Sequence, residues 1–309
     1  MRKLERRFIS ALKEGCLAEL TAMVKSDASL CLELRGDYIN VYYRGGNLME
    51  LRKNGQSANE YIASFDTNYF AAGEEIALPD RIVHSRMELA GWLDLWPVLK
   101  QAIDRWMSST KANAEREFQQ LALRDNNFGS IAKDTDYYVC DIEFQSAHGR
   151  FDMIAVHWPS EPAVRKQTRA RRLVFVEVKY GDGALGNLHA HLDHVNAFAS
   201  EPNQLKRFKE DMVHVFNQKW ELGLVDCGKP LQSFSSKKPI FLLMLANHDP
   251  QKSALSGFLG SLPASPHVDV RIATASFLGY GLYEPCVHRV ETVLECLREY
   301  ALVPRHSTR

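Results

Sequence analysis

The first third of the chain mixes helical and strand spacing of its apolar residues. Apolar positions recur at roughly helical intervals through residues 2–25, which predicts one amphipathic helix. Alternating positions then predict a β-hairpin, in which strands at 32–44 and 48–53 are joined by the turn Gly45-Gly46-Asn47. A further short strand is expected within 61–70. This part of the chain therefore has α+β character.

From residue 86 onward the pattern is typical of an α/β domain. Residues 86–124 are expected to be largely helical, with breaks near Pro97 and Ser108-Ser109. The order that follows is strand, strand, strand, helix, helix, strand, one or two strands and a final helix, at about 137–144, 150–157, 173–179, 187–199, 203–219, 240–246, 268–290 and 290–302. This order predicts a mixed central β-sheet flanked by helices, with at least one hairpin.

A change of composition near Ala77-Leu78-Pro79-Asp80 suggests a domain boundary near residue 85. We expect residues 1–85 to form an N-terminal α+β region of unassigned function. Residues 86–309 are expected to form the α/β domain.

Composition excludes some classes of protein. Lys plus Arg and Asp plus Glu each number 38, so no overall positive field indicates nucleic acid, and such binding would rest on local patches. The six cysteines are scattered without a C-x-x-C pair, which favours reduced thiols over a disulfide framework or a zinc knuckle. The longest apolar run, 239–246, is far short of the ~20 residues of a membrane span. We predict a cytoplasmic protein with no membrane partner and no signal or transit peptide.

The most informative segment is Val174-Phe175-Val176-Glu177-Val178-Lys179, an apolar run that ends in a carboxylate and an ammonium group. Residues two apart on a strand point to the same face, so both charges project together from the end of a core strand. Burial of two charges needs a compensating partner. A divalent metal is one such partner, and Asp152 on the preceding strand is a second candidate ligand. The alternative to a metal site is a solvated salt bridge at a strand end with no catalytic role.

This arrangement resembles the PD-(D/E)XK, or restriction-endonuclease-like, nuclease superfamily over roughly residues 112–246. Asp152 matches the first acidic position, although Phe151 stands where a proline is usual, and Glu177 and Lys179 match the second half of the motif. Glu117 matches the helical glutamate often found upstream, with Glu115 as the alternative.

A weaker match lies downstream. Gln204 falls where many members carry a glutamine on the following helix, and Phe208 stands where some have tyrosine.

The resemblance implies a restriction-endonuclease-like core and a Mg²⁺- or Mn²⁺-dependent nuclease. Asp152 and Glu177 would bind the cation, with the Val178 carbonyl as a third ligand, and Lys179 would assist the attacking water or stabilise charge in the transition state. Glu117 would orient a water or help to bind a second metal. The expected partner is nucleic acid, DNA in preference to RNA, and a protein partner or homo-oligomer stays open.

Two other motifs lie beside this segment. His189-Ala190-His191-Leu192-Asp193-His194 spells the H-x-H-x-D-H string of the metallo-β-lactamase superfamily, which predicts a zinc-dependent hydrolase as an alternative. However, Leu188, Leu192 and Val195 recur at helical spacing, and a helix would point His189 and His191 to opposite sides. One of these histidines is a candidate substrate contact of the nuclease. A G-x-G-x-x-G string at 181–186 lacks the sequence context of a dinucleotide site.

A basic loop lies between the aspartate strand and the Glu-x-Lys strand. One interpretation is that this loop binds the substrate and neutralises backbone phosphates. The alternative is a solvated loop that has no such role. Its cations are Arg165, Lys166, Arg169, Arg171 and Arg172. A third hypothesis is a catalytically inactive nucleic-acid-binding module that keeps the fold.

Overall fold

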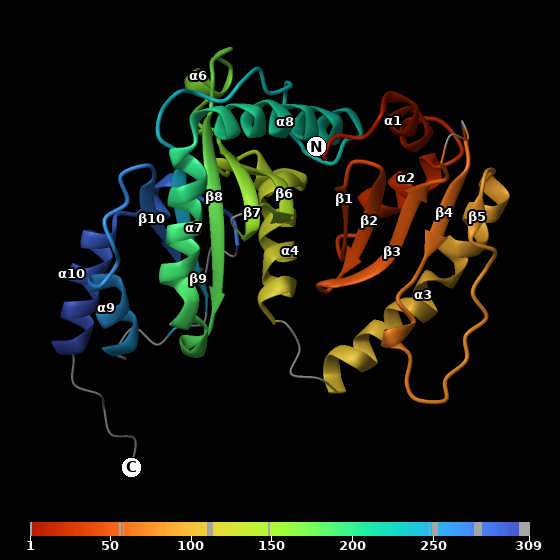
Figure 1. Ribbon diagram of the computed structural model, residues 1–309, viewed down its shortest axis with the longest axis horizontal. Coiled ribbons are helices and arrows are strands. Elements are labelled where there is room, and N and C mark those ends of the chain that lie inside the picture. Colours follow the sequence, from red (N-terminus) through yellow and green to blue (C-terminus); the bar gives the residue numbers. More distant parts are fainter. Residues whose placement is uncertain are drawn as a thin grey trace. The chain divides into compact units, whose positions relative to one another are not determined.

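The computed structural model describes residues 2–55, 57, 59–109, 114–147, 149–246, 248, 253–274 and 280–302. Two compact units make up the chain (Figure 1). The first contains residues 1–128 and 211–231, and the second contains residues 129–210 and 232–309. Each unit has its own β-sheet with helices, which confirms the predicted α/β class.

The first unit holds an antiparallel sheet whose strands follow the order of the sequence. The strands are β1 (Leu30–Leu34), β2 (Tyr38–Tyr43), β3 (Gly46–Lys53), β4 (Tyr61–Ser64) and β5 (Ile82–Val83). Its helices are α1 (Arg6–Lys13), α2 (Ala18–Ser26), the short η1 (Thr67–Tyr69), α3 (Arg86–Ser109), α4 (Ala114–Asn127) and the second half of α8 (Pro202–Glu221). Phe8, Leu12, Trp92 and Trp96 are among its buried core side chains.

Three local predictions for this unit were wrong. The helix expected over residues 2–25 is two helices, and the chain turns between them at Gly15, where a Cβ atom would lie 2.7 Å from the Ala11 Cα. The strand expected over 32–44 is two strands, separated by a turn in which Gly36 has φ of +88°. Pro97 lies within α3 and does not interrupt it.

The second unit contains a mixed sheet in the order β11-β10-β9-β8-β7-β6. The strands are β6 (Tyr137–Gln145), β7 (Arg150–His157), β8 (Arg172–Tyr180), β9 (Ile240–Ala246), β10 (Asp269–Thr274) and β11 (Val287–His288). Strands β6, β7 and β8 are antiparallel neighbours, β9 and β10 run parallel to β8, and β11 pairs antiparallel with β10.

Helices of the second unit connect and cover these strands. They are α5 (Gly129–Ala132), α6 (Pro162–Arg165), η2 (Asp182–Asn187), α7 (Leu188–Ser200), the first half of α8, α9 (Ser253–Gly260), η3 (Glu284–Cys286) and α10 (Val290–Leu302). Aromatic rings fasten α7 and α8 to the sheet, because Phe198 of α7 and Phe208 of α8 both pack on Phe175 of β8. This packing fixes the helix that follows β8 against the strand on which the candidate site lies.

The division between the units differs from the boundary expected near residue 85. Helix α3 belongs to the first unit, where the indole of Trp92 is buried and donates a hydrogen bond to the Asp80 carbonyl at 2.8 Å. The chain also returns to this unit after residue 210, and Gln218 exchanges two hydrogen bonds with the main chain of Leu4. The second unit therefore begins at Gly129, and a segment from the middle of the chain completes the first.

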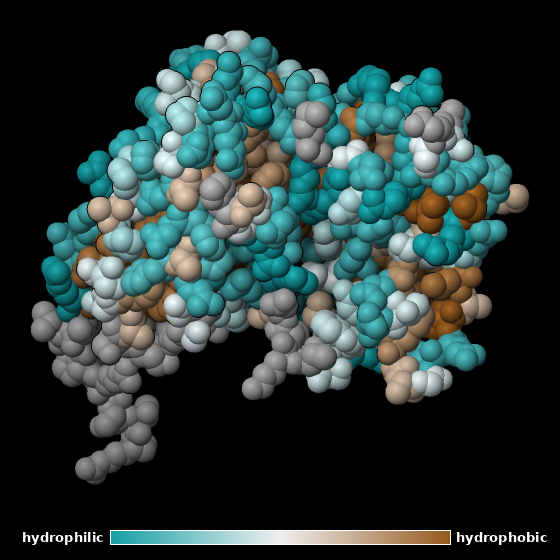
Figure 2. All heavy atoms as spheres, in the orientation of Figure 1, coloured by the Kyte–Doolittle hydropathy of each residue, from teal (hydrophilic) through white to brown (hydrophobic). Residues whose placement is uncertain are grey.

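Within the described ranges, the helices are too short or too polar to cross a bilayer. On the face that Figure 2 shows, hydrophilic side chains cover most of the surface of each unit.

Candidate functional site

The charged end of β8 is buried, as the sequence predicts. The Lys179 ammonium lies 2.6 Å from Oε1 of Glu177, and their side chains are only 7% and 3% exposed. Both residues are paired in register with leucines of β9, Glu177 with Leu243 and Lys179 with Leu245. The two side chains therefore meet on one face at the edge of the apolar core. The alternative that they form a solvated salt bridge at the strand end is excluded.

Asp152 lies directly beside this pair. The register of β7 with β8 ends at Met153 and Val176, and one further step along both strands leads to Asp152 and Glu177. At this point the Val178 N–H donates a hydrogen bond of 2.9 Å to Oδ2 of Asp152. A side-chain carboxylate thus takes the place of the main-chain acceptor that a continuing ladder would supply. Asp152 is 2% exposed. The strand register and this hydrogen bond therefore bring Asp152 to the buried end of β8 that carries Glu177 and Lys179.

Two histidines contact the same strand end. On the first turn of α7, His191 places Nδ1 3.2 Å from Oε1 of Glu177, and its side chain is 30% exposed. After β9, His248 places Nε2 3.1 Å from the Lys179 carbonyl oxygen. The sequence predicted only that some histidine of the H-x-H-x-D-H string would reach the site. A place on the first turn of the helix after the Glu-x-Lys strand narrows the choice to His189 and His191, and the structure turns His189 to Phe258 and His191 to Glu177.

The histidine string does not assemble a zinc cluster. Its residues lie on α7, as the apolar spacing predicts, and each histidine has a different neighbour. His189 stacks on Phe258 at 4.6 Å, His191 contacts Glu177, and His194 packs against Gly149. In the part of the chain that the structure describes, no three His, Cys, Asp or Glu side chains are grouped so that they could hold a metal ion.

Glu117 belongs to the first unit of the chain and has its partner there. Helix α4 belongs to the first unit, and there the Arg44 guanidinium donates to both carboxylate oxygens of Glu117, at 2.9 and 3.4 Å. Arg44 also pairs with Asp104 at 2.8 Å. Glu117 is therefore part of an ion-pair cluster of the first unit.

Three arginines of the predicted substrate loop have structural roles. Arg165 donates to the carbonyls of Lys133 and Thr135, and its guanidinium lies 5.2 Å from the ring centroid of Tyr138. Arg171 is 3% exposed, donates to several main-chain carbonyls and lies over the Trp158 ring at 4.6 Å.

Arg172 pairs with Asp269 at 2.9 Å and donates to the Lys238 carbonyl. Of the loop's cations, Lys166 and Arg169 have exposed side chains.

The loop also lies at the wrong end of the sheet to contact a substrate at Asp152. Arg172 begins β8 and Lys179 nearly ends it, seven residues later, which corresponds to about 23 Å along a strand. The loop therefore lies at the opposite end of β8 from the carboxylates, and its role in neutralising backbone phosphates stays a prediction. The reason is simple: a connection between antiparallel strands joins the ends opposite to those that carry Asp152 and Lys179.

Gln204 is likewise at the far end. Helix α7 runs back from the site for 13 residues, about 20 Å, before α8 begins. On α8, Lys209 donates to the carbonyl of Ser235, whose N–H donates to the carbonyl of Arg171 next to the start of β8. Helix α7, the first α-helix after β8, contributes His191 to the site. Gln204 is half-buried on α8, away from the site.

The donor set at the site fits a hard divalent cation. Mg²⁺ and Mn²⁺ prefer oxygen ligands, and Mg²⁺ commonly uses only one or two protein carboxylates and keeps several waters. Asp152 and Glu177 provide two buried carboxylates, and Val178 directs its N–H toward Asp152. Since the N–H and C=O of a strand residue point to the same side, the Val178 carbonyl is directed there as well.

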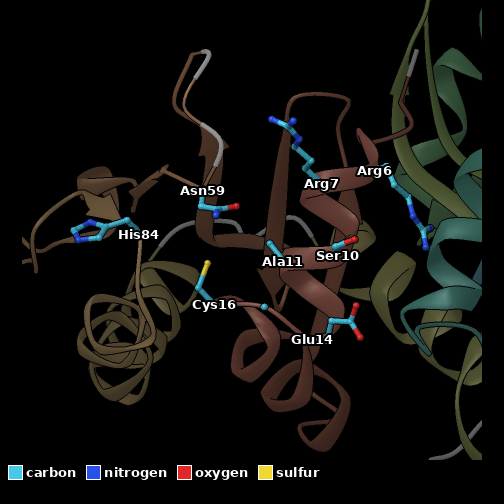
Figure 3. A pocket seen from close by; sticks show the side chains of 9 residues that line it. Arg6, Arg7, Ser10, Ala11, Glu14, Cys16, Asn59 and His84 are labelled. Atoms are coloured by element: carbon cyan, nitrogen blue, oxygen red, sulfur yellow. The ribbon is translucent and has the colours of Figure 1, made fainter.

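A hollow of about 480 Å³ in the first unit was not predicted from the sequence. Figure 3 shows Cys16, Asn59 and His84 on its wall. Two of its charged groups are already paired, Arg6 with Glu221 at 2.6 Å and His84 with Glu88 at 3.3 Å. Burial raises the pKa of the Cys16 thiol, which disfavours the reactive thiolate. We assign no chemistry to this hollow.

Comparison of the chain with protein-family models, with curated proteins and with solved structures gave no match. The geometry around Asp152, Glu177 and Lys179 is therefore the basis for a proposed function.

Proposed function

We propose that the second unit is a metal-dependent nuclease that hydrolyses phosphodiester bonds in nucleic acid, DNA in preference to RNA. The observation that supports this most strongly is the buried Glu177–Lys179 pair with the Asp152 carboxylate at the adjoining peptide. A sheet in which an antiparallel hairpin precedes a parallel strand is also compatible with a restriction-endonuclease-like core.

The buried pair is hard to explain by stability alone. Burial of each ion costs several kcal/mol even after relaxation, and apolar residues of similar volume are often as good or better for stability. Glu177 and Lys179 lie on the same strand, so their contact joins no separate elements. A role in binding and reaction of a charged substrate explains why charges occupy this position.

The proposed cation site consists of Asp152, Glu177 and the Val178 carbonyl. When bound there, Mg²⁺ or Mn²⁺ would polarise the scissile phosphate and lower the pKa of a coordinated water.

The side chains of the site hold this arrangement and contribute charge. The Val178 N–H fixes Asp152, while Lys179 and His191 both contact the same oxygen of Glu177 and so restrict its rotamer. The Lys179 ammonium, close to the carboxylates, stabilises negative charge that develops on the phosphoryl oxygens. His191 is partly exposed beside Glu177, and in this proposal it would donate a hydrogen bond to a substrate phosphate.

The test is a cleavage panel with the purified full-length chain. Duplex, single-stranded and branched DNA and single-stranded RNA are incubated with Mg²⁺ or Mn²⁺, and with EDTA as the control. We expect cleavage of at least one substrate that requires the metal and is abolished by Glu177→Gln. Nucleic-acid binding without cleavage under either metal would instead identify the inactive binding module. Activity that needs stoichiometric zinc and survives Glu177→Gln would identify the zinc hydrolase.

A further inference from the structure

A basic pocket lies at the end of the second unit's sheet that is remote from Asp152. Its volume is about 390 Å³, and its wall includes His157, Arg169, Arg171, Arg172, Ser235 and Lys237. These residues come from the end of β7, the start of β8 and the segment before β9, all within one unit. About 23 Å of strand separate it from Lys179.

The pocket has an excess of positive charge. Four permanent cations line it, and no carboxylate does so within the described part of the chain. Two carboxylates pair with lining residues from outside the pocket: Glu284 lies 2.9 Å from His157, and Asp269 is shared between Arg172 at 2.9 Å and Arg271 at 3.0 Å. Although burial opposes it, hydrogen bonds from Arg271 and Arg172 lower the pKa of Asp269, so this carboxylate stays charged and still offsets only one of its two arginines.

Several contacts hold the wall of the pocket, and one of its polar atoms has no hydrogen-bond partner among the described residues. Arg171 is held by carbonyls and by the Trp158 ring, and its main chain pairs with Ser233 and Ser235. The Ser235 hydroxyl oxygen is buried and makes no hydrogen bond to any described residue. A buried hydroxyl without a partner usually marks a place where water, an ion or a ligand is bound. Arg169 and Lys237 are exposed at the rim and are available to an incoming anion.

We propose that this pocket binds a phosphate group. Arginine forks match the paired oxygens of phosphate, and several cations around one cavity favour a dianion over a single carboxylate. A cavity of this size accommodates a phosphate together with the ribose or base that carries it. The shared chemistry is a phosphate, either free or belonging to a nucleic acid, and the proposal does not rest on the nuclease activity of the other end of the sheet.

Inorganic phosphate is the first probe. Its binding to the full-length chain is measured by isothermal titration at constant ionic strength, with chloride as the reference anion. We expect saturable binding that Arg169→Ala/Lys237→Ala weakens at least tenfold. The matched control, Lys206→Ala/Arg207→Ala, removes two exposed cations of the same unit and should leave the affinity unchanged.

The outcomes separate this proposal from the proposed nuclease. Absence of saturable binding, or equal loss in the two double-alanine variants, overturns the phosphate site whatever the cleavage panel shows. Because the four substituted cations are exposed, thermal unfolding should be unaffected and serves as the check on folding.

Oligonucleotides then identify the source of the phosphate, and Asp152→Asn protein is used so that no substrate is consumed. Competition by a 5′-phosphorylated but not a 5′-hydroxyl oligonucleotide indicates a terminal phosphate. Equal competition by both indicates a backbone phosphate, and competition by neither indicates free phosphate. Each of these results requires, and so supports, the phosphate site itself.

Discussion

Two buried lysine–glutamate pairs, one in each unit, have the same contact distance and different surroundings. In the first unit Lys219 lies 2.6 Å from Glu33, and in the second unit Lys179 lies 2.6 Å from Glu177. The Lys219–Glu33 pair joins helix α8 to strand β1, across 186 positions of sequence. The Lys179–Glu177 pair joins two residues of one strand, beside a third charged side chain, Asp152.

The comparison gives the Lys219–Glu33 pair a structural role and leaves the Lys179–Glu177 pair to the proposed nuclease site. A buried pair that connects distant elements specifies how they pack, and loss of one partner leaves a buried charge. A buried pair within one strand does not specify how separate elements pack. No gain in packing specificity therefore offsets the free energy of desolvating its two charges. We therefore expect loss of either lysine to lower stability, because a buried carboxylate is left without its lysine, and only loss of Lys179 to lower the activity per folded molecule.

The largest expected effect is on catalysis at Asp152. Asp152→Asn keeps an oxygen that can accept from the Val178 N–H and removes the negative charge. We expect the cleavage rate to fall by about 10²–10⁴-fold, on the scale of a lost catalytic group, with little change in thermal unfolding. Asp193→Asn is the matched control, because Asp193 is exposed on α7 and belongs to the histidine string. If Asp193→Asn abolished activity and Asp152→Asn did not, the zinc alternative would replace the nuclease.

The next largest effect is on the stability of the first unit. Lys219→Met leaves Glu33 buried, with Arg35 at 3.9 Å as its remaining ionic contact among the described pairs. We expect the free energy of unfolding to fall by about 3–5 kcal/mol, measured by urea denaturation. A loss below 1 kcal/mol would mean that the long-range pair does not hold α8 on β1.

A smaller effect concerns the helix that brings His191 to Glu177. Gly149 has φ of +144°, and a Cβ there would lie 2.6 Å from Nδ1 of His194. Gly149→Ala should therefore strain the β6–β7 hairpin against α7 and cost about 1–3 kcal/mol of stability. Gly183→Ala is the control, since no described atom lies within 4 Å of a Cβ at that position. Equal melting temperatures for the two variants would contradict this contact.

The smallest expected change in stability comes from removing both charges of the local pair. Glu177→Gln/Lys179→Met should leave the free energy of unfolding within about 1 kcal/mol of the parent, or raise it, because no charge is left without its partner. Urea denaturation in EDTA gives the comparison. A loss of several kcal/mol would show that the Glu177–Lys179 pair supports the fold, and the contrast with Lys219–Glu33 would disappear.

The sequence predicts the candidate site better than its surroundings. The strands around Asp152 and Glu177 and the final helix at 290–302 follow from local periodicity, and the common face of Glu177 and Lys179 follows from strand geometry. Arg165 and Arg171 bind carbonyls and aromatic rings that only the tertiary fold brings near them. Because the sequence does not show these contacts, the positive charge of the two arginines suggested substrate binding. The unit boundary was missed because α3 packs on a sheet that precedes it and the chain returns after residue 210.

The most direct test of the central claim is the ratio of two specific activities. Lys179→Met and Lys219→Met each remove one ammonium from a buried pair with the same 2.6 Å contact. Cleavage of one labelled DNA in Mg²⁺ is measured at equal concentrations of folded protein, with the parent chain alongside. We predict that Lys219→Met retains the parent rate per folded molecule and that Lys179→Met is at least about 100-fold slower. Equal rates for the two variants would contradict the assignment of Lys179 to a nuclease site.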